Sequence, residues 1–180
     1  TGRYEEASEQ YESLESEESV AATYGMALCE MATGKYEAAQ RRLNAALKSD
    51  EAASFRALLA QLHFLQGQYE SAQTHCDKAI AADESQCLAR WIIAELHRIR
   101  GELDDAAAAY DWLVEYYNNT DEIDDVNSLH AIGLAAAQQA RWKHDSEQFR
   151  FLVSRFYPDL LRREKNFWPA RLEMGRLFLE

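Results

Sequence analysis

Apolar and polar positions alternate along the chain with a helical rather than a strand period. Runs of β-branched residues are scarce, and alanine, glutamate, leucine and arginine dominate, which favours helices. Glycines and polar residues punctuate the pattern at short intervals, where helices are expected to end. We therefore predict an all-α protein, with helices over residues 20–33, 36–48, 54–66, 69–81, 88–100 and 103–116.

Three of these breaks have the same short sequence motif, a glycine followed five residues later by an alanine. Gly34, Gly67 and Gly101 each lie between two predicted helices and each precede an alanine by five residues, and they stand 33 and 34 residues apart. A fixed period of this size is typical of a solenoid in which each unit packs on its neighbours. Glycine suits the junction because a helix often ends on a left-handed residue, so we expect a positive φ at Gly67 and Gly101.

Small residues recur in step with the glycines. Alanines five residues after each glycine are expected to let the second helix approach the first, and alanines seven residues before it are expected to match them. Residues nine past each glycine are larger and are expected to fill the space between successive helix pairs. These three sets are Ala39, Ala72 and Ala106; Ala27, Ala60 and Ala94; and Leu43, Cys76 and Tyr110.

The glycine turns, the small-residue pairs and the period together resemble the tetratricopeptide repeat family, whose helix–turn–helix unit has 34 residues. The chain departs from the family at the first aromatic position, which holds Thr23, Arg56 and Arg90, and in lacking the closing proline of the three central repeats. The resemblance implies a right-handed superhelical solenoid of antiparallel helix hairpins. We expect a half repeat over 1–19, repeats over 20–52, 53–86, 87–120 and 126–158, and the first helix of a further repeat over 166–180.

The outer repeats follow the pattern less regularly. The turn motif also begins at Gly2, and the fourth turn is expected at Ala140, with Asp145 in place of the small alanine. The polar residues 118–125 are expected to form a lengthened linker, and residues 159–167 a second insertion. Because the chain begins and ends within a repeat, we expect it to be a fragment of a longer protein.

Charge and composition narrow the partners. The net charge is −12, which disfavours nucleic acid and anionic membranes and allows a basic protein partner. No apolar stretch approaches the roughly 20 residues that span a membrane. The three cysteines, Cys29, Cys76 and Cys87, form no C-x-x-C pair and are expected to be free buried thiols. Free thiols fit a reducing compartment, which favours the cytoplasm.

Motifs for catalysis or metal binding are absent from the sequence. It has no H-E-x-x-H, no phosphate-binding glycine loop and no G-x-S-x-G elbow. His63 and His97 lie one repeat apart at a register expected to be buried, so we assign them to packing. The acidic run 121–125 lacks the glycine and distal glutamate of a calcium loop, and we expect a solvated linker that caps the next helix. We predict neither enzymatic activity nor a cofactor.

The resemblance also implies a binding surface, because first helices line the concave face in this family. The groove positions then place an aromatic stripe of Tyr24, Phe64, Trp91 and His130 beside the polar residues Gln61, Glu95 and Arg98. Such a surface suits an extended peptide or a partner helix. The lysines and asparagines with which chaperone-binding members hold a terminal carboxylate are missing, since Tyr24, Leu28, Ala57 and Trp91 occupy those positions.

We therefore predict a non-catalytic protein–protein interaction scaffold with a peptide or helix in its concave groove. Two alternatives remain open at this point. The chain is an accessory module that positions substrate for a larger enzyme, or it self-associates into a structural array through its open repeat ends.

Overall fold

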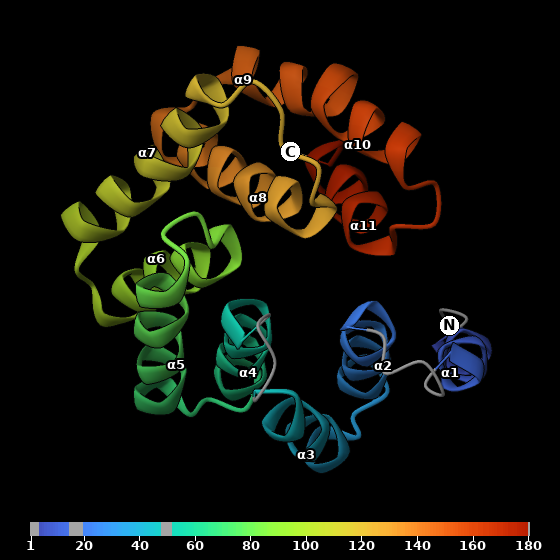
Figure 1. The fold of residues 1–180 in the computed structure, drawn as a ribbon. Coiled ribbons are helices and arrows are strands. Elements are labelled where there is room, and N and C mark those ends of the chain that lie inside the picture. Colours follow the sequence, from blue (N-terminus) through green and yellow to red (C-terminus); the bar gives the residue numbers. More distant parts are fainter. Residues whose placement is uncertain (1–3, 15–19, 48–51, 180) are drawn as a thin grey trace. The chain divides into compact units, whose positions relative to one another are not determined.

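The computed structural model describes residues 4–14, 20–47 and 52–179, and these residues form helices and short connections without any strand. The all-α prediction is confirmed. The turn motif at Gly2 lies outside the described residues. The helices are α1 (Tyr4–Leu14), α2 (Val20–Ala32), α3 (Tyr36–Ala46), α4 (Ala52–Leu65), α5 (Tyr69–Ala82), α6 (Cys87–Arg100), α7 (Leu103–Asn119), α8 (Val126–Lys143), α9 (Ser146–Phe151), α10 (Tyr157–Arg163) and α11 (Trp168–Leu177) (Figure 1).

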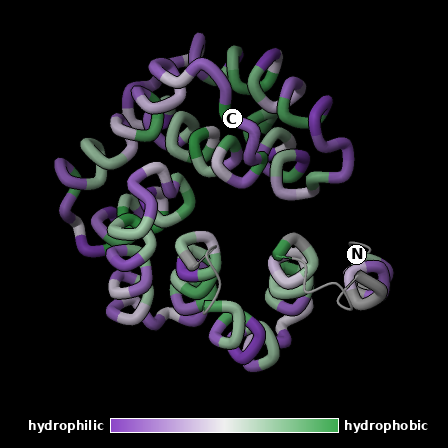
Figure 2. Tube along the Cα trace, in the orientation of Figure 1, coloured by the Kyte–Doolittle hydropathy of each residue, from purple (hydrophilic) through white to green (hydrophobic). Residues whose placement is uncertain are grey.

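The chain divides into two compact units, residues 1–92 and 93–180, with the boundary inside α6. In the first unit, α2 packs on α3 and α4 packs on α5, so consecutive helices form hairpins. Hydrophobic and hydrophilic residues alternate along these helices, as Figure 2 shows. The apolar sides meet in a core that includes Ala27, Leu43, Leu58 and Leu62, all without solvent exposure.

The three glycine turns adopt the backbone conformation that the sequence predicts. The φ angles are 76° at Gly34, 72° at Gly67 and 79° at Gly101. At the first turn, the amide of Lys35 donates to the carbonyl of Glu30 at 2.8 Å, and the amide of Gly34 donates to Met31 at 3.2 Å. This pair of bonds is a Schellman motif, and it satisfies carbonyls that the ending helix would otherwise leave without a partner.

Close packing inside the hairpins is likewise confirmed. The alanines on both sides of each turn are completely buried, and so are the larger residues nine positions past each glycine. Burial of an alanine at this contact leaves no room for a longer side chain, because protein interiors are packed as densely as organic crystals. The buried sets are Ala27, Ala60 and Ala94; Ala39, Ala72 and Ala106; and Leu43, Cys76 and Tyr110.

The second unit departs from this regularity after α7. The prediction of a turn at Ala140 is wrong: α8 continues to Lys143, and the turn residue is His144, in the left-handed region at φ 52°. Asp145 does not replace a packing alanine, since it caps α9 by accepting from the amides of Glu147 and Gln148. An uninterrupted run of helix-forming residues, four of them alanine, carries α8 one turn past the expected stop.

The helical segment that packs back on α8 is also longer than expected. Residues 159–163, predicted to lie in an insertion, are helical and belong to α10. A π-helical segment, η2 (Leu152–Phe156), joins α9 to α10, and the Tyr157 amide donates to the Leu152 carbonyl. Pro158 lies directly after this wider turn, in the first turn of α10. Proline has no amide hydrogen to donate and ordinarily ends a helix, but here the helix continues past it.

The linker between α7 and α8 caps the helix that follows it. Asp125 accepts hydrogen bonds from the amides of Asn127 and Ser128, at 3.2 and 2.8 Å. The predicted capping role of this acidic run is confirmed. Among the described helices, none has the length and apolar character needed to cross a bilayer.

Candidate binding surface

An aromatic cluster in the first unit brings together two of the predicted binding residues. Phe64 of α4 and Trp91 of α6 meet edge to face, with ring centroids 6.3 Å apart and planes at 60°. Tyr69, the first residue of α5, lies 5.9 Å from Phe64. All three rings are half-buried, so each offers part of its surface to solvent. Partly exposed aromatic rings held by one another are typical of protein-binding surfaces.

Tyr24 and Gln61 occupy less distinctive positions in the same unit. Tyr24 of α2 is half-buried and packs against the core cluster that contains Met31 and Phe55. Gln61 of α4 is also half-buried, three residues before Phe64. The structure therefore supports a local surface around Phe64, Tyr69 and Trp91, which we call the Phe64–Trp91 surface. Partner binding by these residues, like the longer stripe, remains a prediction.

In the second unit, the predicted polar contacts are engaged with each other. Arg98 donates to a Glu95 carboxylate oxygen at 2.6 Å through Nη2 and at 3.0 Å through Nε. The buried hydroxyl of Tyr110 donates to the other oxygen of Glu95. Burial, followed by this bond to Glu95, raises the pKa of Tyr110. Glu95 is only 12% exposed, so its main task is to satisfy two donors.

His130 of α8 lies within an aromatic cluster of the second unit. Its ring meets Phe167 edge to face at 5.5 Å and Tyr157 at 6.3 Å. Burial lowers the pKa of His130 to about 4, because the charged imidazolium would lose its hydration. At neutral pH, His130 is therefore an uncharged packing residue.

Two contributors were missed by the sequence reasoning. Tyr69 is not among the predicted binding residues, although an aromatic residue two positions past the turn glycine recurs at Tyr36 and gave the available signal. Tyr110 was assigned to filling space, and it does so, but its hydroxyl also fixes Glu95. Nothing in the one-dimensional pattern shows that bond, which joins residues 15 positions apart.

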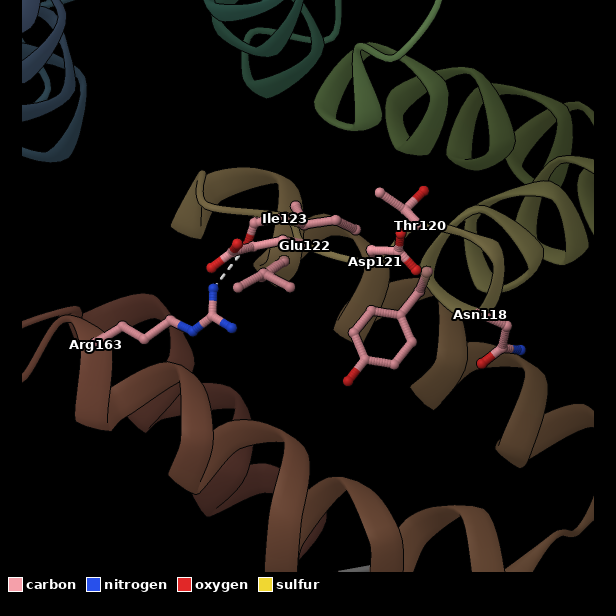
Figure 3. Close-up of a pocket in the computed structure, with 8 residues that line it drawn as sticks. Asn118, Thr120, Asp121, Glu122, Ile123 and Arg163 are labelled. Atoms are coloured by element: carbon pink, nitrogen blue, oxygen red, sulfur yellow. Dashed lines mark hydrogen bonds between the residues drawn. The ribbon is translucent and has the colours of Figure 1, made fainter.

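The inserted linker forms a small polar pocket in the second unit (Figure 3). Its volume is about 290 Å³, and its lining includes Tyr117, Asp121, Glu122 and Leu129. Arg163 of α10 donates from Nη1 to the carbonyl of Ile123 at 2.8 Å and so ties the linker to the hairpin that follows. The linker is thus a structured part of this unit as well as a connection.

Histidine and cysteine chemistry is limited in the described residues. His63 is buried as predicted, whereas His97 is half-exposed and places Nδ1 2.6 Å from a Glu102 oxygen. His97, Glu102 and Asp105 form the one group of three side chains among the described residues that could hold a metal ion. The three cysteines are free and buried, and burial raises the pKa of Cys76 to about 12, so its reactive thiolate is not populated.

Comparisons with known proteins agree with this architecture. Residues 1–62 match the model of the tetratricopeptide repeat family. The fold is similar to a crystal structure of MamA, with a TM-score of 0.51, 18% identity and coverage of 96% of this chain and 89% of that chain. It is also similar to a monomeric mutant of IFIT1 with m7Gppp-AAAA, with a TM-score of 0.56, 17% identity and coverage of 99% and 43%. At these identities the likeness shows the fold alone. A comparison with curated protein sequences gave no match.

Proposed function

We propose that the protein is a non-catalytic scaffold that binds a partner protein. The proposal is supported by the match of residues 1–62 to the tetratricopeptide repeat model and by the helical hairpins that follow them. The family serves in general as a protein-interaction module. The finer part of the proposal is that the partner offers a peptide or a helix and that the Phe64–Trp91 surface receives it.

The observation that carries the proposal is the Phe64–Trp91 contact itself. Two large rings from different helices are braced edge to face, and both keep part of their surface exposed. Bracing lowers the conformational entropy that a binding residue would lose on contact with a partner. Aromatic anchors of this kind often account for most of the energy of an interface, at about 2 kcal/mol or more each.

Charge narrows the class of partner. With a net charge of −12, the protein attracts basic chains over distances of about a Debye length and repels acidic ones. A basic peptide with one or two apolar anchors, either extended or helical, satisfies both the charge and the aromatic surface.

The experiment is selection of binding peptides from a random displayed library with the full chain as bait, followed by affinity measurement for the selected peptides. We expect basic sequences with apolar anchors, and a loss of affinity of at least tenfold for Trp91→Ala and Phe64→Ala. The matched control is Trp168→Ala, which removes an exposed tryptophan from α11 and should leave affinity unchanged. Peptides that bind both tryptophan variants equally well would place the interface elsewhere.

Exposed apolar residues of α11 and of its C-cap, Phe178, favour a second candidate function, self-association. Trp168, Leu172 and Phe178 are 53%, 61% and 68% exposed. A Cβ placed at Gly175 would meet nothing within 4 Å, so this part of the helix is uncovered. Apolar patches of this kind tend to pair. Sedimentation over a concentration series should show association that Leu172→Lys abolishes, and a monomer at all concentrations would exclude it.

A further inference from the structure

Two histidines face each other inside the second hairpin. His63 of α4 and His75 of α5 stack with ring centroids 5.2 Å apart and planes at 11°. His63 is 7% exposed, and its Nδ1 lies 2.5 Å from Oε1 of Gln68, an oxygen that can only accept, so Nδ1 carries a proton. Nδ1 of His75 is buried and has no hydrogen-bond partner among the described residues.

The same two positions hold a different pair in the hairpin before it. Counted from the turn glycine, His63 and His75 correspond to Glu30 and Arg42. Those side chains form a two-pronged ion pair, with Arg42 nitrogens 3.0 and 3.1 Å from the Glu30 oxygens. The position thus joins the two helices of a hairpin in both repeats, through opposite charges in one and through stacked imidazoles in the other.

Stacked imidazoles differ from an ion pair in their response to protons. Two neutral rings attract through their faces, whereas two imidazolium rings at this distance repel each other and must also be desolvated. The charged groups that act on His75 increase this cost, since they are Arg56 of α4 and Lys78 of α5, both cationic. Burial is the largest cause that lowers the pKa of His75, followed by His63, Lys78 and Arg56.

We propose that the stacked His63–His75 pair is a pH-sensitive joint, which holds α4 on α5 while His75 is neutral and loosens the second hairpin in mildly acidic solution. The folded state binds a proton at His75 less readily than the unfolded chain does, because the ring is partly buried and is stacked on a second imidazole. The contribution of neutral His75 to stability is therefore fully present above the unfolded pKa of about 6.5 and is lost as the pH falls below it. For each proton taken up on opening, the ratio of open to closed hairpin rises by up to about tenfold for each unit by which the pH falls.

The joint lies next to the Phe64–Trp91 surface. Phe64 follows His63 in α4, and Tyr69, which contacts Phe64, begins α5. A hairpin that opens in acid therefore also weakens the contact between Phe64 and Tyr69 in that surface. Only this consequence, release of a partner in acid, rests on the proposed function, and the joint itself does not.

The test is hydrogen exchange of the full chain at about pH 7.5 and about pH 5.5, corrected for the intrinsic pH dependence of exchange. In the wild type, we expect the amides of α4 and α5 to lose protection at the lower pH relative to those of α2 and α3. The double variant His63→Glu/His75→Arg introduces the ion pair of the preceding hairpin and should abolish this difference. The double variant His63→Leu/His75→Leu should also abolish this difference, because two leucines keep an apolar contact between the helices and carry no imidazole ring.

The matched control is His97→Gln, which removes the histidine at the same register in the next hairpin, where Ala109 takes the place of His75. It should leave the response of α4 and α5 unchanged. In the wild type, an equal change in protection of the two hairpins between the two pH values would overturn the proposal. So would a pH response that persists in both double variants. Peptide binding is not measured here, so failure of the joint and failure of the binding surface are told apart.

Discussion

The hairpin of α4 and α5 and the hairpin of α8 with α9 and α10 solve the same packing problem in different ways. In the first, Gly67 forms the turn, α5 begins without a side-chain cap, and buried alanines bring the helices together. In the second, His144 takes the left-handed position and Asp145 caps the following helix. Helix ends can therefore be specified either by backbone freedom or by a hydrogen-bonding side chain.

The contact between the two helices differs as well. Ala72 is fully buried five residues after its turn glycine, whereas the residue five past His144 is Phe149, which is half-exposed. Close approach in the later hairpin occurs instead at Gly133, where a Cβ would lie 2.7 Å from the hydroxyl of Tyr157. One hairpin is closed by small residues from both helices, and the other by a glycine from one helix and an aromatic ring from the other.

Acid should distinguish the two units most strongly through His130. Its folded-state pKa of about 4 lies below the unfolded value of about 6.5, so its contribution is complete above pH 6.5 and disappears as the pH falls toward 4. We expect a loss of roughly 2–3 kcal/mol of stability in the second unit over that range. Acid unfolding followed by exchange of the α8 amides measures it. His130→Phe should flatten this part of the pH profile, and a profile identical to the wild type would show that the ring is solvated.

Changing the residue five positions past the turn should give the next largest difference between the two hairpins. Ala72→Leu forces extra methylenes into a filled contact and should lower the free energy of unfolding by about 1–3 kcal/mol. Phe149→Leu, at the corresponding distance from its turn, should cost much less because the ring is half-exposed. Urea unfolding of both variants gives the comparison. An unchanged midpoint for Ala72→Leu would mean that α4 and α5 are not in close contact.

The turn residues should respond in opposite directions. Gly67→Ala places a Cβ on a left-handed backbone and should cost about 1 kcal/mol. His144→Gly removes the same strain and should stabilise by some tenths to about 1 kcal/mol, less the chain entropy that glycine adds to the unfolded state. Thermal melts of the two variants, read against the wild type, test both signs. A loss of stability on His144→Gly would show that the imidazole makes a contact worth more than the strain.

Capping should give an effect no larger than that of the turn residues, and in the second unit alone. Asp145→Ala removes the acceptor for two amides at 3.0 Å and should cost about 1 kcal/mol, within the usual range for such caps. Lys35 is the corresponding N-cap residue of α3, and its side chain makes no capping hydrogen bond. Lys35→Ala should therefore change the melting temperature little. Comparable losses for both variants would mean that the helix dipole, rather than the cap bond, sets the stability of these ends.

The accuracy of the sequence-based predictions follows the same division. The turns at Gly67 and Gly101 and the buried alanines could be predicted because one residue type has a conformation or a size that no other residue shares. The turn at Ala140 was wrong because helix-forming residues continue past it, and neither His144 nor Asp145 signals a stop as strongly as glycine does. The helix through Pro158 could not be predicted, since it depends on the π-helical bonds before it.

For the candidate surface, the sequence determined which residues recur at corresponding places on successive first helices, because position within a fixed period depends on residue number alone. Tertiary structure decided which of them face solvent and which face each other. Phe64 and Trp91 remain partly exposed, Glu95 and Arg98 pair, and His130 packs against the rings of Tyr157 and Phe167. The reason is physical: burial and hydrogen bonding depend on what packs against a residue, and in each of these cases the deciding neighbour comes from another turn or another helix.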